Sequence, residues 1–172
     1  MNIYSRPDPP GNSAFPIAMP GYPIIFASAF TTLVFALLGF SILSLACLLF
    51  TFFSCYFFRD PDRSVPNAPK VVVSPADGKV IIADVLEESE FYEGRCLKVS
   101  VFMSVFNVHV NRMPHEGKIT KTFYHPGKFF SAHLDKASKE NEHNAIFIET
   151  PSGKKICTVQ IAGNRSPDYL QY

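Results

Sequence analysis

The feature that most constrains this chain is a stretch of 36 residues, from Pro23 to Phe58, without a single charged side chain. One helix of that length would measure about 54 Å, whereas the apolar part of a bilayer is roughly 30 Å thick. The stretch therefore suits two short helices that fold back near Gly39, or one long helix that leaves the bilayer at one end. The remaining residues are too few to cover so much apolar surface, so we expect a membrane-embedded α-helical segment over residues 23–58.

The residues on either side of this segment indicate an anchor and its orientation. Residues 1–22 are rich in Pro and Gly and form an extended lead-in, with no basic cluster and no small-residue cleavage site of the kind that marks a signal peptide. Arg59, Arg63 and Lys70 follow the segment, and basic residues are enriched on the cytoplasmic side of membrane segments. We therefore expect a protein of the cell membrane whose polar domain is cytoplasmic.

The charges and cysteines exclude several classes of protein. Residues 59–172 hold 15 of the 16 basic and 14 of the 15 acidic side chains, a formal charge of +1. Nucleic-acid binding, which relies on neutralising phosphates, has no support in such a balance. No cysteine pair shows C-x-x-C spacing or a histidine at zinc-like distance, so we expect buried thiols and no metal at Cys47, Cys55, Cys96 and Cys157.

The polar part of the chain changes to an alternation of apolar and polar residues. Six candidate strands are Lys70–Val73, Lys79–Leu86, Cys96–Met103, Lys118–Tyr124, Ala145–Glu149 and Lys155–Ile161. Turn pairs separate them, namely Asp77-Gly78, Glu93-Gly94, Pro126-Gly127 and Ser152-Gly153. Short strands at this spacing predict a small, mostly antiparallel β-domain, with a helix or loop over residues 132–143.

Two stretches of this domain hold residues of chemical interest. In "SPADGKV", Asp77 lies in a turn between apolar strands, where an Asp that only bonds its own backbone is the simpler interpretation. In "VFMSVFNVHVNRMP", strand alternation would put His109 and Asn111 on one face, next to Arg112. Such a group could bind an anion or move a proton, but His109 could equally be a buried core residue.

Taken together, the motifs resemble one family. In order along the chain, they are "FFRDPDR", "SPADGKV", "VFMSVFNVHVNRMP", "GKITKTFYHPGKF" and "DKASKENEHN". This order, behind an apolar segment, is similar to the short (archaeal-type) form of phosphatidylserine decarboxylase, from about Pro16 to Gly163. Two positions depart from the family pattern, because Asn107 stands where Asp is usual and His143 where Arg is usual.

The resemblance implies an activity and a cofactor. Members of the family are proenzymes that cut themselves at a Gly-Ser bond into a large and a small subunit, and the serine becomes a pyruvoyl group. That group draws electrons from phosphatidylserine in the membrane as carbon dioxide leaves, much as pyridoxal phosphate would, and phosphatidylethanolamine results. By this resemblance, Asp77 and His109 are the candidate proton-transfer pair, and Arg112 is a candidate for binding the substrate carboxylate or phosphate.

The C-terminal residues do not follow the family. No glycine here precedes a serine, so the pyruvoyl-forming serine is absent, and Ser166 follows Arg165. The family continues after Gly163 with a strand similar to L-I-A-R-R-I-V-C. One permitted set of codons for residues 164–172 reads I-A-R-R-I-I-C-N from the second base. We therefore expect residues 59–163 to form an incomplete β-domain, residues 164–172 to be an out-of-frame tail, and the chain alone to be inactive and poorly folded.

Three alternatives belong to other classes. A membrane-anchored zinc peptidase would need closely spaced ligands such as H-x-H, which the five histidines do not offer. A lipoyl- or biotinyl-like carrier domain would carry its cofactor on a lysine after Met, and no Met here precedes Lys. A non-catalytic, membrane-anchored lipid-binding paralogue remains open on the sequence, as does a homo-oligomer.

Overall fold

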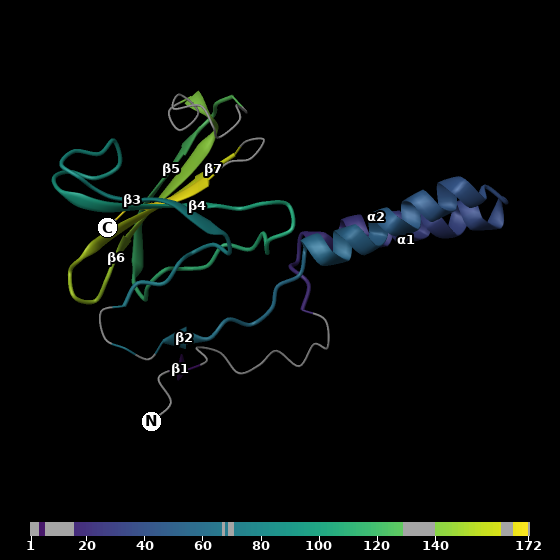
Figure 1. The fold of residues 1–172 in the computed structure, drawn as a ribbon, viewed down its shortest axis with the longest axis horizontal. Coiled ribbons are helices and arrows are strands. Elements are labelled where there is room, and N and C mark those ends of the chain that lie inside the picture. Colours follow the sequence, from purple (N-terminus) through teal and green to yellow (C-terminus); the bar gives the residue numbers. More distant parts are fainter. Residues whose placement is uncertain are drawn as a thin grey trace. The chain divides into compact units, whose positions relative to one another are not determined.

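The computed structural model describes residues 4–5, 16–66, 68, 71–128, 140–162 and 167–171. The chain divides into two compact units (Figure 1). The first comprises Met1–Pro69 together with Val105–Val110, and the second comprises Lys70–Ser104 together with Asn111–Tyr172. A short piece of the "VFMSVFNVHVNRMP" motif therefore belongs to the helical unit, although the motif is flanked on both sides by the β-rich unit.

The first unit is built on two helices. Helix α1 spans Gly21–Leu37 and helix α2 spans Ser41–Phe57, so the apolar segment is helical, as expected, and is interrupted at Gly39. Gly39 has a φ of 79°, a left-handed conformation that favours glycine and reverses the chain between the helices. Two short strands, β1 (Tyr4–Ser5) and β2 (Val65–Pro66), pair antiparallel in the same unit.

The two helices meet through small and polar side chains, while their large apolar side chains point outward. The Thr51 hydroxyl donates to Ser28 Oγ at 3.0 Å, and the Ser44 hydroxyl donates to the Thr32 carbonyl at 3.3 Å. Ser54 is only 3% exposed, whereas Ile42 is 86% exposed. This arrangement is the reverse of that in a water-soluble bundle, whose apolar residues face one another.

The expectation that this segment is embedded in a membrane is not supported by helix length. No helix in the described part of the chain is both long enough and apolar enough to cross a membrane.

The second unit is a six-stranded antiparallel sheet in the order β3-β4-β8-β7-β6-β5 (Figure 1). Its strands are β3 (Lys79–Leu86), β4 (Cys96–Phe102), β5 (Lys118–His125), β6 (His143–Glu149), β7 (Lys155–Ile161) and β8 (Pro167–Gln171). The fold class predicted from the sequence, a mostly antiparallel β-domain preceded by helix, is confirmed. Strand β8 lies between β4 and β7 and joins the two halves of the sheet.

The core of the sheet is concentrated in its inner strands. One apolar cluster consists of Ala145, Cys157, Val159 and Ile161, and a second consists of Ile148 and Ile156. Residues of β3 and β5, at the two edges, are mostly exposed. Of the four cysteines expected to be buried, Cys96 and Cys157 are buried, whereas Cys47 and Cys55 are only half-buried. Burial raises the pKa of the Cys157 thiol to about 12.

Five of the six expected strands are confirmed, with ends that move by at most two residues, and one is wrong. Residues 71–73, the described part of the expected strand Lys70–Val73, form no strand. Val73 instead donates its N–H to the Pro114 carbonyl at 2.9 Å, and Pro75, two residues later, has no N–H to give to a ladder. Most of the expected helix or loop over residues 132–143 lies outside the described residues.

Candidate functional site

Two motif loops of the second unit are joined through their backbones. The Arg112 N–H donates to the Pro75 carbonyl at 2.8 Å, and the Val73 N–H donates to the Pro114 carbonyl at 2.9 Å. Pro75 and Pro114 are both buried. The "SPADG" loop and the "NRMP" loop, which are far apart in the sequence, therefore lie side by side, and the segments that carry Asp77 and Arg112 come together.

The turn at Asp77 depends on the glycine that follows it. Asp77 is half-buried, next to the buried Ala76, and Ser74 Oγ donates to the Ala76 carbonyl at 2.7 Å. A Cβ on Gly78 would meet the backbone oxygen of Phe102 and would lie 2.8 Å from Val101 Cγ1. Asp77-Gly78 is thus more than a common turn pair, because the absence of a side chain lets the turn approach strand β4 closely.

His109 belongs to the first unit and is not in a strand. The structure has no strand over residues 103–117, so the prediction that His109 and Asn111 share a strand face is wrong. The His109 ring instead stacks on Phe57, with ring centroids 4.2 Å apart and ring planes 25° from parallel. His109 Nδ1 lies 3.0 Å from the carbonyl oxygen of Asn107, which can only accept. In the neutral ring, Nδ1 therefore carries the proton and Nε2 has the free lone pair.

The loop that carries His109 is held by residues that the sequence analysis did not select. The Phe106 carbonyl accepts from Tyr56 Oη at 3.1 Å and from Arg59 Nη2 at 2.8 Å. Tyr56 and Phe57 are the last residues of helix α2, and Phe57 and Arg59 belong to the "FFRDPDR" motif. The signal was present, since the motif directly follows the apolar segment, but spacing alone did not link it to residue 109.

A second pair of histidines lies at one end of the sheet. His125 of β5 and His143 of β6 are register partners, and their rings stack with centroids 4.9 Å apart. His143, at the position where the family usually has Arg, is 4% exposed, and its Nδ1 lies 2.9 Å from the Asn141 carbonyl. Among the described residues, no group of three or more His, Cys, Asp or Glu side chains could hold a metal ion.

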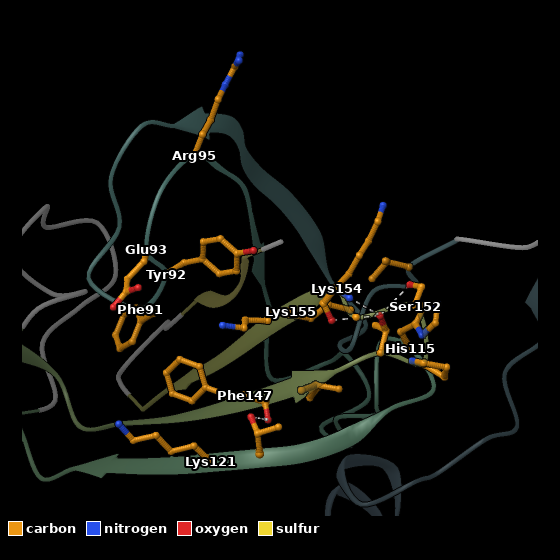
Figure 2. A pocket seen from close by; sticks show the side chains of 17 residues that line it. Phe91, Tyr92, Glu93, Arg95, His115, Lys121, Phe147, Ser152, Lys154 and Lys155 are labelled. Atoms are coloured by element: carbon orange, nitrogen blue, oxygen red, sulfur yellow. Dashed lines mark hydrogen bonds between the residues drawn. The ribbon is translucent and has the colours of Figure 1, made fainter.

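The second unit also has an open hollow of about 1090 Å³ along strands β5, β6 and β7 (Figure 2). Aromatic rings of Phe91, Tyr92 and Phe147 line it together with Lys121 and Lys155, whereas the Arg95 and Lys154 side chains point away. None of Asp77, His109 and Arg112 lines this hollow. The candidate chemistry thus lies on the motif loops and not in this hollow.

Comparison with known proteins indicates the same family as the motifs do. The family model described as phosphatidylserine decarboxylase matches residues 50–165. The phosphatidylserine decarboxylase proenzyme of Syntrophus aciditrophicus is 52% identical over 148 residues, which are 86% of this chain and 70% of the relative. That of Desulfotalea psychrophila is 50% identical over 86% of this chain and 69% of its own length. No solved structure matches.

The chain belongs to the phosphatidylserine decarboxylase family. The family match includes the end of α2, both linked loops and strands β3 to β7, so the motif residues described above all lie within it. It ends at residue 165, within the segment 164–172 that the sequence analysis expects to be out of frame.

The close approach at Gly78 gives a testable prediction for the Asp77 turn. We expect Gly78→Ala to destabilise the sheet by about 1–3 kcal/mol, because the new methyl group has to displace the turn from strand β4. The measurement is the free energy of unfolding in denaturant, with the protein in detergent. Gly94→Asn is the matched control, since a Cβ at Gly94 meets nothing within 4 Å and Asn tolerates its positive φ. Equal stability of both variants and the parent would contradict the prediction.

Proposed function

We propose that this chain provides the proton-transfer and substrate-binding residues of a pyruvoyl-dependent phosphatidylserine decarboxylase, which forms phosphatidylethanolamine in phospholipid biosynthesis. The observation that carries the proposal is 52% identity to a proenzyme of that name over 86% of the chain. The word proenzyme implies a processed form with two chains, and we extend that form to this protein.

The residues present fit one half of this chemistry. A pyruvoyl group draws electrons from the carbon that loses carbon dioxide, and the serine that would form it is not among these 172 residues, because no glycine precedes a serine. What the chain does offer is an imidazole with a free Nε2, a carboxylate and a guanidinium in family motifs. These are the groups needed to move a proton and to bind an anion.

Each of these groups has a role in the proposal. The carbon that loses carbon dioxide must take up one proton, and His109 Nε2 is the candidate donor and acceptor of that proton. Asp77 would orient the imidazole or stabilise its charge, as the acid of a catalytic triad does. Arg112 would bind the carboxylate or phosphate of the substrate, since its planar guanidinium forms paired hydrogen bonds with either anion.

We also propose that the α1–α2 hairpin lies in the apolar part of the cell membrane, with the polar domain in the cytoplasm. The support is the reversed burial of the hairpin, in which Ser28 and Ser54 are buried and large apolar side chains are exposed. Helices pack in this way in lipid, where apolar side chains face the acyl chains and small or polar residues form the interface. Arg59 and Arg63, directly after the hairpin, favour the cytoplasmic side.

Membrane insertion can be tested by adding charge to the exposed face of the hairpin. We expect Ile42→Asp combined with Phe52→Asp to move most of the protein out of the membrane fraction, because each charge costs about 2.5–3.5 kcal/mol in the bilayer. The measurement is flotation with vesicles that contain phosphatidylserine. Val85→Asp, at a residue of β3 that is 52% exposed, is the control and should float like the parent. Flotation of the double variant would rule out insertion of this face.

We further propose that residues 164–172 are read in another frame from the family's next strand. The support is the alternative reading I-A-R-R-I-I-C-N together with the end of the family match at residue 165. The measurement is a DNA read beyond the codon for Gly163, translated in all three frames. Continuation into a segment that ends in Gly-Ser is the expected result, and the absence of any such segment in every frame would refute it.

The enzymatic proposal is tested with the chain completed by a serine-bearing segment. We expect release of carbon dioxide from carboxyl-labelled phosphatidylserine, and a loss of about 10²–10⁴-fold in His109→Gln and in Asp77→Asn, the typical contribution of a general acid–base group. His115→Gln is the matched histidine control. Full activity of both site variants would contradict the assigned roles. Selective binding of phosphatidylserine without any release of carbon dioxide would instead favour a non-catalytic lipid-binding relative.

A further inference from the structure

We infer that the end of α2 and the residues directly after it position the imidazole of His109, with Phe57 as the platform for the ring and Tyr56 and Arg59 as the anchor of its loop. The inference rests on the proposed function, in which His109 carries the proton. All of these residues belong to the first unit, so their contacts are formed within one compact body.

The anchor is a single carbonyl group with two donors. Tyr56 Oη and Arg59 Nη2 both donate to the Phe106 oxygen, across 50 and 47 residues of sequence respectively. Arg59 is itself held, because its Nη1 donates to the Tyr56 carbonyl at 2.7 Å and its guanidinium lies 3.9 Å from the centroid of the Tyr56 ring. A guanidinium fixed in this way loses little further freedom when it binds the loop.

The side chains of the loop tip do not explain why the loop is held. Phe106 is 66% exposed and Val105 is 53% exposed, so burial of these two residues contributes little. Only Val108 of this stretch is fully buried, at 1% exposure. The backbone of residues 106–107 is therefore fixed mainly by polar contacts from α2, one residue before the carbonyl that accepts from His109.

Two contacts then fix the imidazole itself. The hydrogen bond to the Asn107 carbonyl selects the tautomer with the proton on Nδ1, and the stack on Phe57 restricts rotation of the ring about its Cβ–Cγ bond. Because the acceptor is a backbone oxygen, Asn in place of the usual Asp at residue 107 leaves this hydrogen bond unchanged. Phe57 touches no reacting atom in this scheme, and it acts as a positioning residue through His109.

The experiment uses the full 172-residue chain in detergent micelles with ¹⁵N-labelled histidine. The His109 signals are assigned by their loss in His109→Gln. The NMR shifts of the two ring nitrogens then report the tautomer. The upfield ring-current shift of the ring protons reports the stack on Phe57. We expect Phe57→Leu to lose the upfield shift and to give a mixture of tautomers. Phe57→Tyr should restore both features, because it keeps an aromatic face. Phe52→Leu is the matched control on an exposed face of the same helix.

A second variant keeps the test decisive if Phe57→Leu fails to fold. Tyr56→Phe removes only the hydroxyl that donates to the Phe106 carbonyl, and we expect partial loss of the tautomer preference with the fold intact. His109 signals in Phe57→Leu and Tyr56→Phe that match the parent would overturn the inference. In the completed enzyme, an unchanged pH profile of kcat in Phe57→Leu would also overturn it. Expected His109 signals in the 172-residue chain, together with no release of carbon dioxide by the completed enzyme, would count against the proposed function and leave the positioning intact.

Discussion

The loops that carry Asp77, His109 and Arg112 lie outside the sheet, so their backbone carbonyl groups accept hydrogen bonds from other loops or from side chains. The organisation of the candidate site follows from these hydrogen bonds. A buried or half-buried carbonyl without a hydrogen bond costs about 1–3 kcal/mol, so extended chain outside a ladder needs specific partners. Here the buried Pro75 carbonyl receives the Arg112 N–H, and the more exposed Phe106 carbonyl receives Tyr56 of α2 and Arg59, two residues past the end of that helix. The loops that carry Asp77, His109 and Arg112 are defined by these few bonds.

This constraint also explains where the sequence predicted the structure well and where it did not. Strands β3 to β7 follow from alternation between clear turn pairs, and each of them finds a neighbour in the sheet. Residues 107–111 show the same alternation and residues 71–73 are continuously apolar, but neither stretch forms a strand, and Val73 bonds to Pro114 of a loop. Alternation reports an extended, half-buried backbone and does not distinguish a ladder from a pair of crossing loops. Pro75 and Pro114, each next to one of these stretches, were the available warning.

The sequence predicted the residues of the candidate site but not the contacts that hold them. The motifs identified Asp77, His109 and Arg112 as candidate site residues. The structure joins the loop of Asp77 to the loop of Arg112 through two backbone hydrogen bonds. Their pairing with His109 stays a prediction. The contacts of Tyr56, Phe57 and Arg59 with the His109 loop span about fifty residues of sequence, and no periodicity or spacing rule links positions so far apart. Only the order of "FFRDPDR" before "VFNVHV" hinted that the two stretches work together.

The two units follow opposite rules of burial, and this contrast bears on the position of His109. In the sheet, Ile148 and Val159 are buried while the edge strands are exposed, as expected for a protein surrounded by water. In the hairpin, Ser28 and Ser54 are buried while large apolar side chains face outward, as expected in lipid. The change from one rule to the other occurs at residues 56–59, where the helix ends and Arg59 appears. His109 stacks on this turn, so the same few residues that mark the edge of the apolar surface also hold the candidate base.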